Sequence, residues 1–259
     1  MSKINNLECF LSKVQSGKLA VGACVTFSDP AVTELCADAG LDFLWIDGEH
    51  GEMDRNTAML HMMAIRGTEC ASFYRVPSCN HTEIKRIIDF APAGVIVPMI
   101  LSAEDAALAV AACRYPPAGN RGCGMRRQHR YGADPITQEY WENSRREPLV
   151  ILQIEHIDAV RDLDRILAVP GVDSLLIGPY DLSASMGHPG EFHHPQVAEA
   201  LDDICRKCRA AGKLLGAYTE GDFDLWKKRR IQYVSSANDT GILLGGMRNM
   251  KKLVTQALA

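Results

Sequence analysis

Acidic residues and a histidine follow directly after one of the most apolar runs of the sequence. Residues 43–46 read FLWI, which is typical of a buried strand, and Asp47, Glu49 and His50 come immediately after them. A histidine can transfer protons near neutral pH. A neighbouring carboxylate would fix the tautomer of His50 and raise its basicity, and position alone favours Asp47 for that role. The alternative for His50 is an ordinary loop histidine.

Two more carboxylates stand at the ends of two other apolar runs: Glu155 is the last residue of the run at 149–155, and Asp181 follows the run at 174–178. This pair suits a hard divalent cation such as Mg²⁺, which takes one or two carboxylates and completes its shell with water or substrate. Gln153 stands two residues before Glu155, so both side chains point to one face of a strand. Gln153 can therefore hydrogen-bond a molecule held by the metal. Helix capping is the alternative for both acids.

A third polar group, Arg75, stands near the end of the apolar run at residues 70–76. Its guanidinium offers a bidentate fork to a carboxylate or to a developing oxyanion. A structural ion pair with a glutamate is the alternative.

The elements that must position these residues alternate regularly. The apolar runs are continuous, which indicates strands covered on both faces of a parallel sheet, and amphipathic helical patterns separate them. This α/β alternation favours a (β/α)₈ TIM barrel. An open doubly wound sheet is second, because no G-x-G-x-x-G follows the first run. The predicted strands are residues 19–27, 42–47, 70–76, 94–99, 149–155, 174–178, 213–218 and 233–238.

Active sites of such barrels form at the carboxyl ends of the strands, and the polar residues above all fall at predicted carboxyl ends. A chance scatter of loop polarity would place them at both ends. The one long irregular insertion, residues 114–148, lies between the fourth and fifth strands, and long loops of this kind are usually functional. No repeat or linker interrupts the chain, so residues 1–259 are expected to form a single domain.

Composition narrows the class of protein. The 259 residues are 47% hydrophobic, with a formal net charge of −4, so a nucleic-acid-binding surface is not expected. No apolar stretch reaches the length of a membrane span, and the start has no apolar signal core, which favours a cytoplasmic location. The nine scattered cysteines suit free thiols. The lone C-x-x-C pair, Cys205 and Cys208, lacks a second pair at zinc-ribbon spacing.

Five motifs follow one another along the chain: FLWIDGEHGEMD, YRVPSCNHTEIKRIIDFAPAGVIVPMI, RYPPAGNRGCG, LQIEH and LLIGPYDLSASMG. In this order they resemble the HpcH/HpaI aldolase family, the metal-dependent class II pyruvate aldolases. The resemblance runs from about Gly22 to about Leu244. Family members include 4-hydroxy-2-oxoheptanedioate and 2-keto-3-deoxy-sugar-acid aldolases.

The resemblance implies roles for the catalytic residues. His50 is similar to the general acid/base, and Asp89 matches the residue that raises the basicity of that histidine. The family pattern thus assigns Asp89, rather than the nearby Asp47, to raise the basicity of His50. Arg75 matches the residue that binds pyruvate and stabilises its enolate.

For the cofactor, the resemblance implies a divalent metal, Mg²⁺, Mn²⁺ or Co²⁺, with Glu155 and Asp181 as its ligands. Asp181, Gln153 and Tyr180 match substrate-binding positions, the last largely through its backbone. Tyr180 departs from the small residue of some members, and its bulk would narrow the aldehyde side of the pocket.

The implied reaction is reversible aldol addition of pyruvate, or a related 2-oxo acid, to an aldehyde. The metal acts as a Lewis acid on the C2 carbonyl, and the base is His50 or a metal-bound water that His50 activates. No Schiff-base lysine is expected, because Lys213, the only lysine in the predicted strands, opens its strand at the amino end.

Other functions are compatible with the same residues. The enolate apparatus could decarboxylate oxaloacetate or cleave a CoA thioester. The thioester version needs a basic patch, for which Arg121, Arg126, Arg127 and Arg130 are candidates; a subunit contact or solvated loop is favoured for that run. A non-catalytic barrel protein is the remaining class. The family also implies a homo-oligomer, a hexamer or trimer. In the sequence, the insertion and the apolar C-terminal segment are the features that suggest one.

Overall fold

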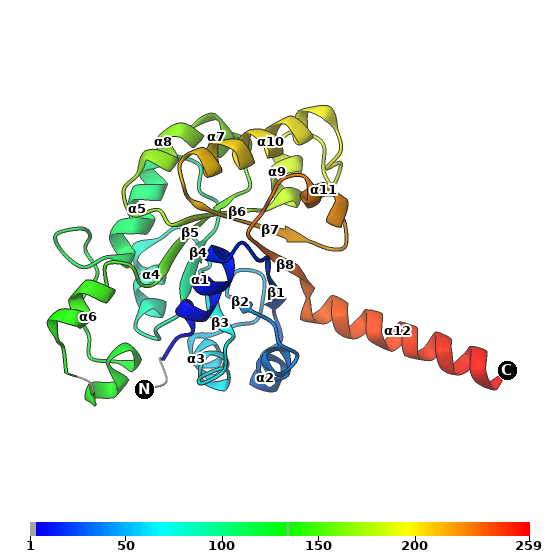
Figure 1. The fold of residues 1–259 in the computed structure, drawn as a ribbon, viewed down its shortest axis with the longest axis horizontal. Coiled ribbons are helices and arrows are strands. Elements are labelled where there is room, and N and C mark those ends of the chain that lie inside the picture. Colours follow the sequence, from blue (N-terminus) through cyan, green and yellow to red (C-terminus); the bar gives the residue numbers. More distant parts are fainter. Residues whose placement is uncertain (1–3, 134) are drawn as a thin grey trace.

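The computed structural model describes residues 4–133 and 135–259. Residues 1–3, part of the start on which the cytoplasmic expectation rests, and residue 134, inside the predicted insertion, lie outside the described residues. Eight parallel strands pair in sequential order and close into one barrel, with helices around its outside (Figure 1). The predicted (β/α)₈ barrel is therefore confirmed.

All eight predicted strands are present, and their bounds differ from the predicted ones by at most two residues. Continuous apolar runs made them identifiable, because nearly every strand position is buried on both faces of the sheet. The strands are β1 (Ala20–Val25), β2 (Phe43–Asp47), β3 (Ala71–Arg75), β4 (Gly94–Val97), β5 (Leu149–Ile154), β6 (Ser174–Ile177), β7 (Leu214–Thr219) and β8 (Tyr233–Asn238).

The helices around the barrel begin at caps that the sequence carries. Asn80, Ser102 and Asp29 each accept a hydrogen bond from the first turn of the helix that follows. The outer helices are α2 (Pro30–Asp38), α3 (Arg55–Ala64), α4 (His81–Ile88), α5 (Ala103–Cys113), α7 (Ile157–Arg161), α8 (Leu163–Ala168), α9 (Pro179–Ser185), α10 (Pro195–Ala210) and α11 (Phe223–Lys227).

Helix α1 (Leu7–Gln15) precedes the first strand and closes the amino end of the barrel. Its Phe10 is 1% exposed. The Phe10 ring makes edge-on contacts with Phe43, Phe73 and Tyr233, at centroid distances of 5.8, 4.9 and 5.5 Å. This aromatic cluster fills the barrel interior below the catalytic end.

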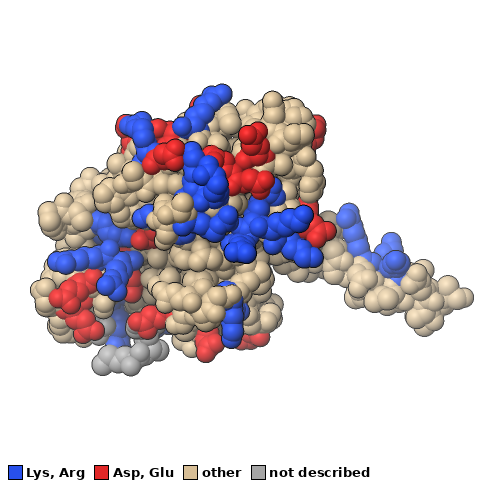
Figure 2. Space-filling model, turned by 45° about the horizontal axis from the view of Figure 1, so that its top comes forward, with Lys and Arg blue, Asp and Glu red and all other residues tan. Residues whose placement is uncertain are grey.

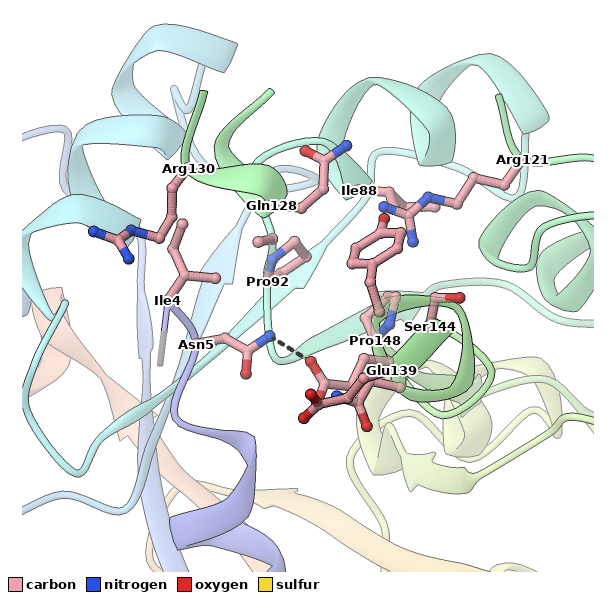
Figure 3. A pocket seen from close by; sticks show the side chains of 14 residues that line it. Ile4, Asn5, Ile88, Pro92, Arg121, Gln128, Arg130, Glu139, Ser144 and Pro148 are labelled. Carbon is pink, nitrogen blue, oxygen red and sulfur yellow. Dashed lines mark hydrogen bonds between the residues drawn. The ribbon is translucent and has the colours of Figure 1, made fainter. Parts of the chain in front are cut away.

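The insertion at residues 114–148 follows α5, which has already returned the chain to the amino end of the barrel. The insertion therefore lies at the end opposite the carboxyl ends of the strands. It contains the 3₁₀ segment η1 (Arg127–Gly132) and α6 (Gln138–Asn143). A cavity of about 400 Å³ lies between these elements and the end of α4 (Figure 3), and Asn5 donates to Glu147 at its edge, at 3.1 Å.

Helix α12 (Asp239–Leu258) follows β8 and projects away from the barrel (Figure 1). Only Asp239 of this 20-residue helix is buried. Figure 2 shows the helix extending from the body of the molecule with few charged side chains. No helix in the described part of the chain is long and apolar enough to cross a membrane.

Candidate active site

A cavity of about 510 Å³ opens at the carboxyl ends of the strands, within the size range of small-molecule sites. Five of the seven residues predicted for the site line it: His50, Arg75, Gln153, Tyr180 and Asp181. The parallel barrel brings them together because each lies at or just beyond the carboxyl end of its own strand.

Arg75 is fixed by two carboxylates from the end of β2. Asp47 accepts from Nε at 2.9 Å and from Nη2 at 2.6 Å, and Glu49 contacts Nη1 at 2.7 Å. The guanidinium also lies 4.6 Å from the centre of the Trp45 ring. The bidentate face predicted for substrate is thus occupied by Asp47, and the Nη1 side is the one that a substrate can reach by displacing Glu49.

Asp47 serves Arg75 rather than the imidazole of His50. Besides the guanidinium, its Oδ1 accepts from the backbone N–H groups of Glu49 and His50, at 3.0 and 3.3 Å. Burial alone would raise the pKa of Asp47, but the hydrogen bonds and charge of Arg75 lower it below its usual value. Burial raises the pKa of Glu49 against the opposing charge of Arg75.

Glu155 is a buried carboxylate directly after β5, 2% exposed. Its Oε1 accepts from the backbone N–H of Met99 at 2.7 Å, and its Oε2 accepts from Gln153. The pKa of Glu155 is raised to about 7. Burial is the main cause, the charges of Glu49 and Asp181 add to it, and the Met99 hydrogen bond and the charge of Arg75 oppose it. Across the part of the chain that is described, no Lys or Arg forms an ion pair with Glu155.

These residues fit a hard divalent cation. Glu155 and Asp181 are close enough for the charge of one to raise the pKa of the other, and an added cation would relieve that repulsion. The buried Gln153 Oε1 has no hydrogen-bond partner among the described residues. Within residues 4–133 and 135–259, no three His, Cys, Asp or Glu side chains converge as a metal site. Mg²⁺ is commonly bound by one or two carboxylates, with water or substrate as its remaining ligands.

Gly178 makes room for the carboxylate. A Cβ at this position would lie 2.8 Å from Oε2 of Glu155 and 3.1 Å from Nε2 of Gln153. Any side chain at position 178 would therefore push the carboxylate out of place.

His50 stands at the mouth of the cavity, with its side chain 69% exposed. Its Nε2 lies 3.9 Å from Oε2 of Glu49. Asp89, predicted to act on His50, caps the carboxyl end of α4 before β4 begins, and there accepts from Gln128 at 3.2 Å. Asp89 thus lies at the amino end of the barrel, and the fold does not bring it to the His50 of its own chain.

Of the four arginines predicted as a basic patch in the insertion, Arg121 and Arg127 are buried, whereas Arg126 is exposed and Arg130 is half-buried. Arg127 is 2% exposed, and its guanidinium donates to the carbonyls of Phe90 and Met62, at 2.5 and 2.8 Å. Arg121 is also buried and lies 4.5 Å from the centre of the Tyr115 ring. These two arginines stabilise the insertion.

Lysine chemistry is also absent from the cavity lining. Lys213 precedes β7 at its amino end, as predicted, and its Nζ donates to the carbonyl of Val172 at 2.8 Å. None of the described residues that line the cavity is a lysine.

Three residues shape the site without having been assigned a role from the sequence. Glu49 stood within the DGEH run, so its acidity was a visible signal. Met99 contributes only a backbone N–H, which its left-handed conformation (φ 50°) aims at Glu155, and no side-chain pattern reveals that. Asp239 accepts from the backbone of Thr26 and Phe27, each at 2.8 Å, and so joins the ends of β8 and β1.

Comparisons with known proteins agree with this geometry. A family model described as HpcH/HpaI aldolase/citrate lyase matches residues 22–221. The chain is 37% identical to a 4-hydroxy-2-oxovalerate aldolase of Rhodococcus jostii (strain RHA1), covering 82% of each chain. It is 33% identical to a 5-keto-4-deoxy-D-glucarate aldolase of Escherichia coli (strain K12), covering 90% of this chain and 91% of that one. The crystal structure of an HpcH/HpaI aldolase from Desulfitobacterium hafniense DCB-2 superposes with a TM-score of 0.87, at 28% identity, covering 94% of this chain and 95% of that one.

Proposed function

The chain belongs to the HpcH/HpaI aldolase/citrate lyase family and is a carbon–carbon lyase, and on that premise we propose that it is a metal-dependent class II aldolase. It cleaves a 4-hydroxy-2-oxo acid reversibly to pyruvate and an aldehyde. The observation that carries the proposal is the buried Glu155 carboxylate, which has no ion-pair partner among the described residues. It lies near Asp181 and contacts Gln153, and Gln153 lines the cavity together with Asp181, Arg75 and His50.

Glu155 and Asp181 would hold the divalent cation, with Gln153 beside it to hydrogen-bond the substrate. When bound, the cation supplies Lewis-acid polarisation of the C2 carbonyl of the 2-oxo acid. A raised pKa, as burial gives Glu155, is expected of a ligand carboxylate before its cation binds. Mg²⁺, Mn²⁺ and Co²⁺ are the candidate ions.

His50 is the proposed base in the cleavage direction. It takes the proton from the C4 hydroxyl while the C4–O bond becomes the carbonyl of the aldehyde. The electron pair of the C3–C4 bond passes to the C2–C3 unit, which gives the enolate of pyruvate, and protonation at C3 completes the reaction. Exposure at the mouth of the cavity lets the imidazole exchange its proton with water.

Arg75 stabilises the negative charge that develops on the 2-oxo acid. Its position is set before substrate arrives, because Asp47 holds Nε and Nη2 together. Such preorganisation places the remaining Nη1 donor where charge appears. Glu49, which occupies Nη1 in the absence of substrate, is the group that substrate would displace.

A homo-oligomer is part of the proposal. Asp89 and His50 lie at opposite ends of one barrel, so Asp89 can raise the basicity of a His50 only in a neighbouring subunit. Helix α12 supplies a surface for assembly. Leu243, Met247, Met250 and Val254 recur at helical spacing along it and are 48–60% exposed.

A second copy of the chain is the partner that this surface fits best. The outer helices α2 and α11, on either side of the point where α12 leaves (Figure 1), expose Leu35 at 67% and Phe223 at 61%. An isolated apolar helix is marginal in water. Two copies that exchange their α12 helices would cover both sets of side chains through one self-complementary interface.

Pyruvate release tests the proposed function. Metal-stripped protein is mixed with 4-hydroxy-2-oxo acids of several chain lengths, with Mg²⁺, Mn²⁺ or Co²⁺ restored, and pyruvate is followed by a coupled assay. Release that needs the metal supports the aldolase. Metal-dependent loss of CO₂ from oxaloacetate, without release from any hydroxy-oxo acid, would instead assign a decarboxylase.

A further inference from the structure

Two tyrosines on one side of the catalytic cavity share a single carboxylate. Tyr180, in the first turn of α9, donates its hydroxyl to Oε2 of Glu220 at 3.2 Å, and Tyr218, on β7, donates to Oε1 at 2.7 Å. An ionised carboxylate only accepts hydrogen bonds, so both hydroxyl protons are committed to it. Glu220 therefore ties the start of α9 to β7.

Aromatic contacts hold the two rings from behind. The Tyr180 ring meets Phe192 edge-on, at 4.8 Å between centroids and 88° between planes. The Tyr218 ring meets Trp45 in the same manner, at 5.9 Å and 74°. We call Tyr180, Tyr218 and Glu220 the tyrosine wall.

The tyrosine wall limits the cavity on this side. Tyr180 and Tyr218 line both the catalytic cavity of about 510 Å³ and a smaller cavity of about 40 Å³, and Glu220 lines the smaller one. The two rings thus separate these spaces. Because the cation ligand Asp181 follows Tyr180 directly in the chain, the wall faces the part of the substrate that lies beyond the 2-oxo acid group.

The wall offers no free donor to a second carboxylate. The hydroxyl protons of Tyr180 and Tyr218 are committed to Glu220, whose negative charge lies behind the two rings, in the lining of the smaller cavity. Among the described lining residues, Arg75 is the one Lys or Arg side chain, and Asp47 and Glu49 already contact all three of its nitrogens. The proposed divalent cation is held at the 2-oxo acid end of the substrate. A carboxylate at the far end would therefore find no free donor in the wall and would face the negative charge of Glu220 behind it.

We propose that the tyrosine wall makes this enzyme select an uncharged aldehyde over one that carries a carboxylate. The inference rests on the proposed aldolase function and adds the class of its second substrate. It separates the chain from those relatives whose substrates are diacids. Cleavage of 5-keto-4-deoxy-D-glucarate, named for one relative, leaves a carboxylate on the aldehyde fragment, whereas cleavage of 4-hydroxy-2-oxovalerate, named for another, leaves none.

A matched pair of substrates tests the inference. 4-Hydroxy-2-oxoheptanoate and 4-hydroxy-2-oxoheptanedioate have the same chain length, and their aldehyde fragments differ only by the terminal carboxylate. We expect kcat/KM for pyruvate release to favour the heptanoate by at least about tenfold, as like-charge contacts are costly. Equal values, or a preference for the diacid, would overturn the inference while leaving the aldolase function intact.

Variants locate the discrimination in the wall. Glu220→Gln removes the negative charge behind the rings but retains a hydrogen-bond acceptor, so the preference for the heptanoate should fall by about tenfold as the repulsion is lost. Glu199→Gln removes an exposed charge from α10 and should leave the ratio as it is. A ratio that Glu220→Gln does not move would contradict the role of Glu220. If no hydroxy-oxo acid releases pyruvate in the wild type, the proposed function fails and the inference fails with it.

Discussion

In the proposed mechanism Glu155 is the side chain on which the chemistry depends most, because it is buried, acidic and has no ion-pair partner among the described residues. Its two hydrogen bonds, from Met99 and Gln153, fix both oxygens. Neither bond supplies a full charge, so ionisation of Glu155 is less favourable than usual and the proposed cation would promote it. This coupling between proton and metal gives the site a measurable pH dependence.

Metal affinity should weaken as pH falls below about 7. The pKa of Glu155 in the folded, metal-free protein is about 7, above its ordinary value of 4.5, chiefly through burial. A raised carboxyl pKa contributes stability at low pH and loses it as pH rises through about 7, and a bound cation restores what is lost. The shift in melting temperature on adding Mn²⁺ should therefore be larger at pH 8 than at pH 6. An equal or larger shift at pH 6 would be inconsistent with Glu155 as a ligand.

His50→Ala should lower kcat/KM for pyruvate release by ~10²–10⁴, the range typical of a missing general base. Metal affinity should remain, because the imidazole is not among the proposed ligands. Calorimetry with Mn²⁺ checks the second expectation, and His193→Ala, an exposed histidine outside the cavity, serves as the control. Full turnover in His50→Ala would exclude His50 as the base.

Individual side chains of the site were predictable from the sequence, but their partners were not. Arg75, Gln153 and Glu155 follow apolar runs, and their place at the carboxyl end of the barrel follows from that pattern. The bidentate pairing of Arg75 with Asp47 depends on the parallel register that sets residues 47 and 75 side by side. The Met99 N–H depends on a positive φ, for which a methionine gives no signal.

The elements below the site determine how rigidly it is held. The strands carry catalytic residues at one end and, at the other, rest on the ring of Phe10 from α1. Helix α1 thereby acts as the floor of the barrel.

Phe10→Ala should destabilise the fold by about 3–5 kcal/mol, the usual loss for a fully buried phenylalanine. The reason is the cavity left among Phe43, Phe73 and Tyr233, which cannot all move into it. Urea unfolding measures the change, with Gln15→Ala on the exposed face of α1 as the control. A loss below about 1 kcal/mol would mean that the floor repacks readily.

Helix boundaries were less predictable than strands. Residues 156–170 carry one amphipathic pattern but form α7 and α8, separated at Asp162. The Asp162 side chain accepts from the backbone N–H of Ala103 at 2.8 Å, a contact with α5 that local sequence cannot reveal. Likewise, the sequence placed residues 114–148 between two strands but did not show which end of the barrel they occupy. They follow α5, which returns the chain to the amino end of the barrel.

At the scale of the whole molecule, one chain does not complete the site that the family resemblance implies. Asp89 lies at the amino end of its own barrel, opposite the catalytic cavity, and α12 presents an apolar stripe to solvent. Both features are accounted for if several copies assemble. The apolar C-terminal segment was visible in the sequence, whereas the separation of Asp89 from His50 needed the barrel to be seen.

Met250→Glu should reduce the mass of the assembly in solution, because it puts a charge in the middle of the α12 stripe. Gln256→Glu adds the same charge outside the stripe and should leave the mass unchanged. Light scattering after size-exclusion chromatography reports both. A wild-type protein that is monomeric at micromolar concentration would refute the proposed exchange of α12.

The most direct test of the central claim is exchange of the C3 protons of pyruvate with D₂O, followed by ¹H NMR. This measurement needs no knowledge of the aldehyde, because it reports only enolate formation. We predict exchange in the wild type with Mg²⁺, Mn²⁺ or Co²⁺ restored, and none in metal-stripped protein or in Glu155→Ala. Exchange that survives both metal removal and Glu155→Ala, or that no metal restores, would contradict the account.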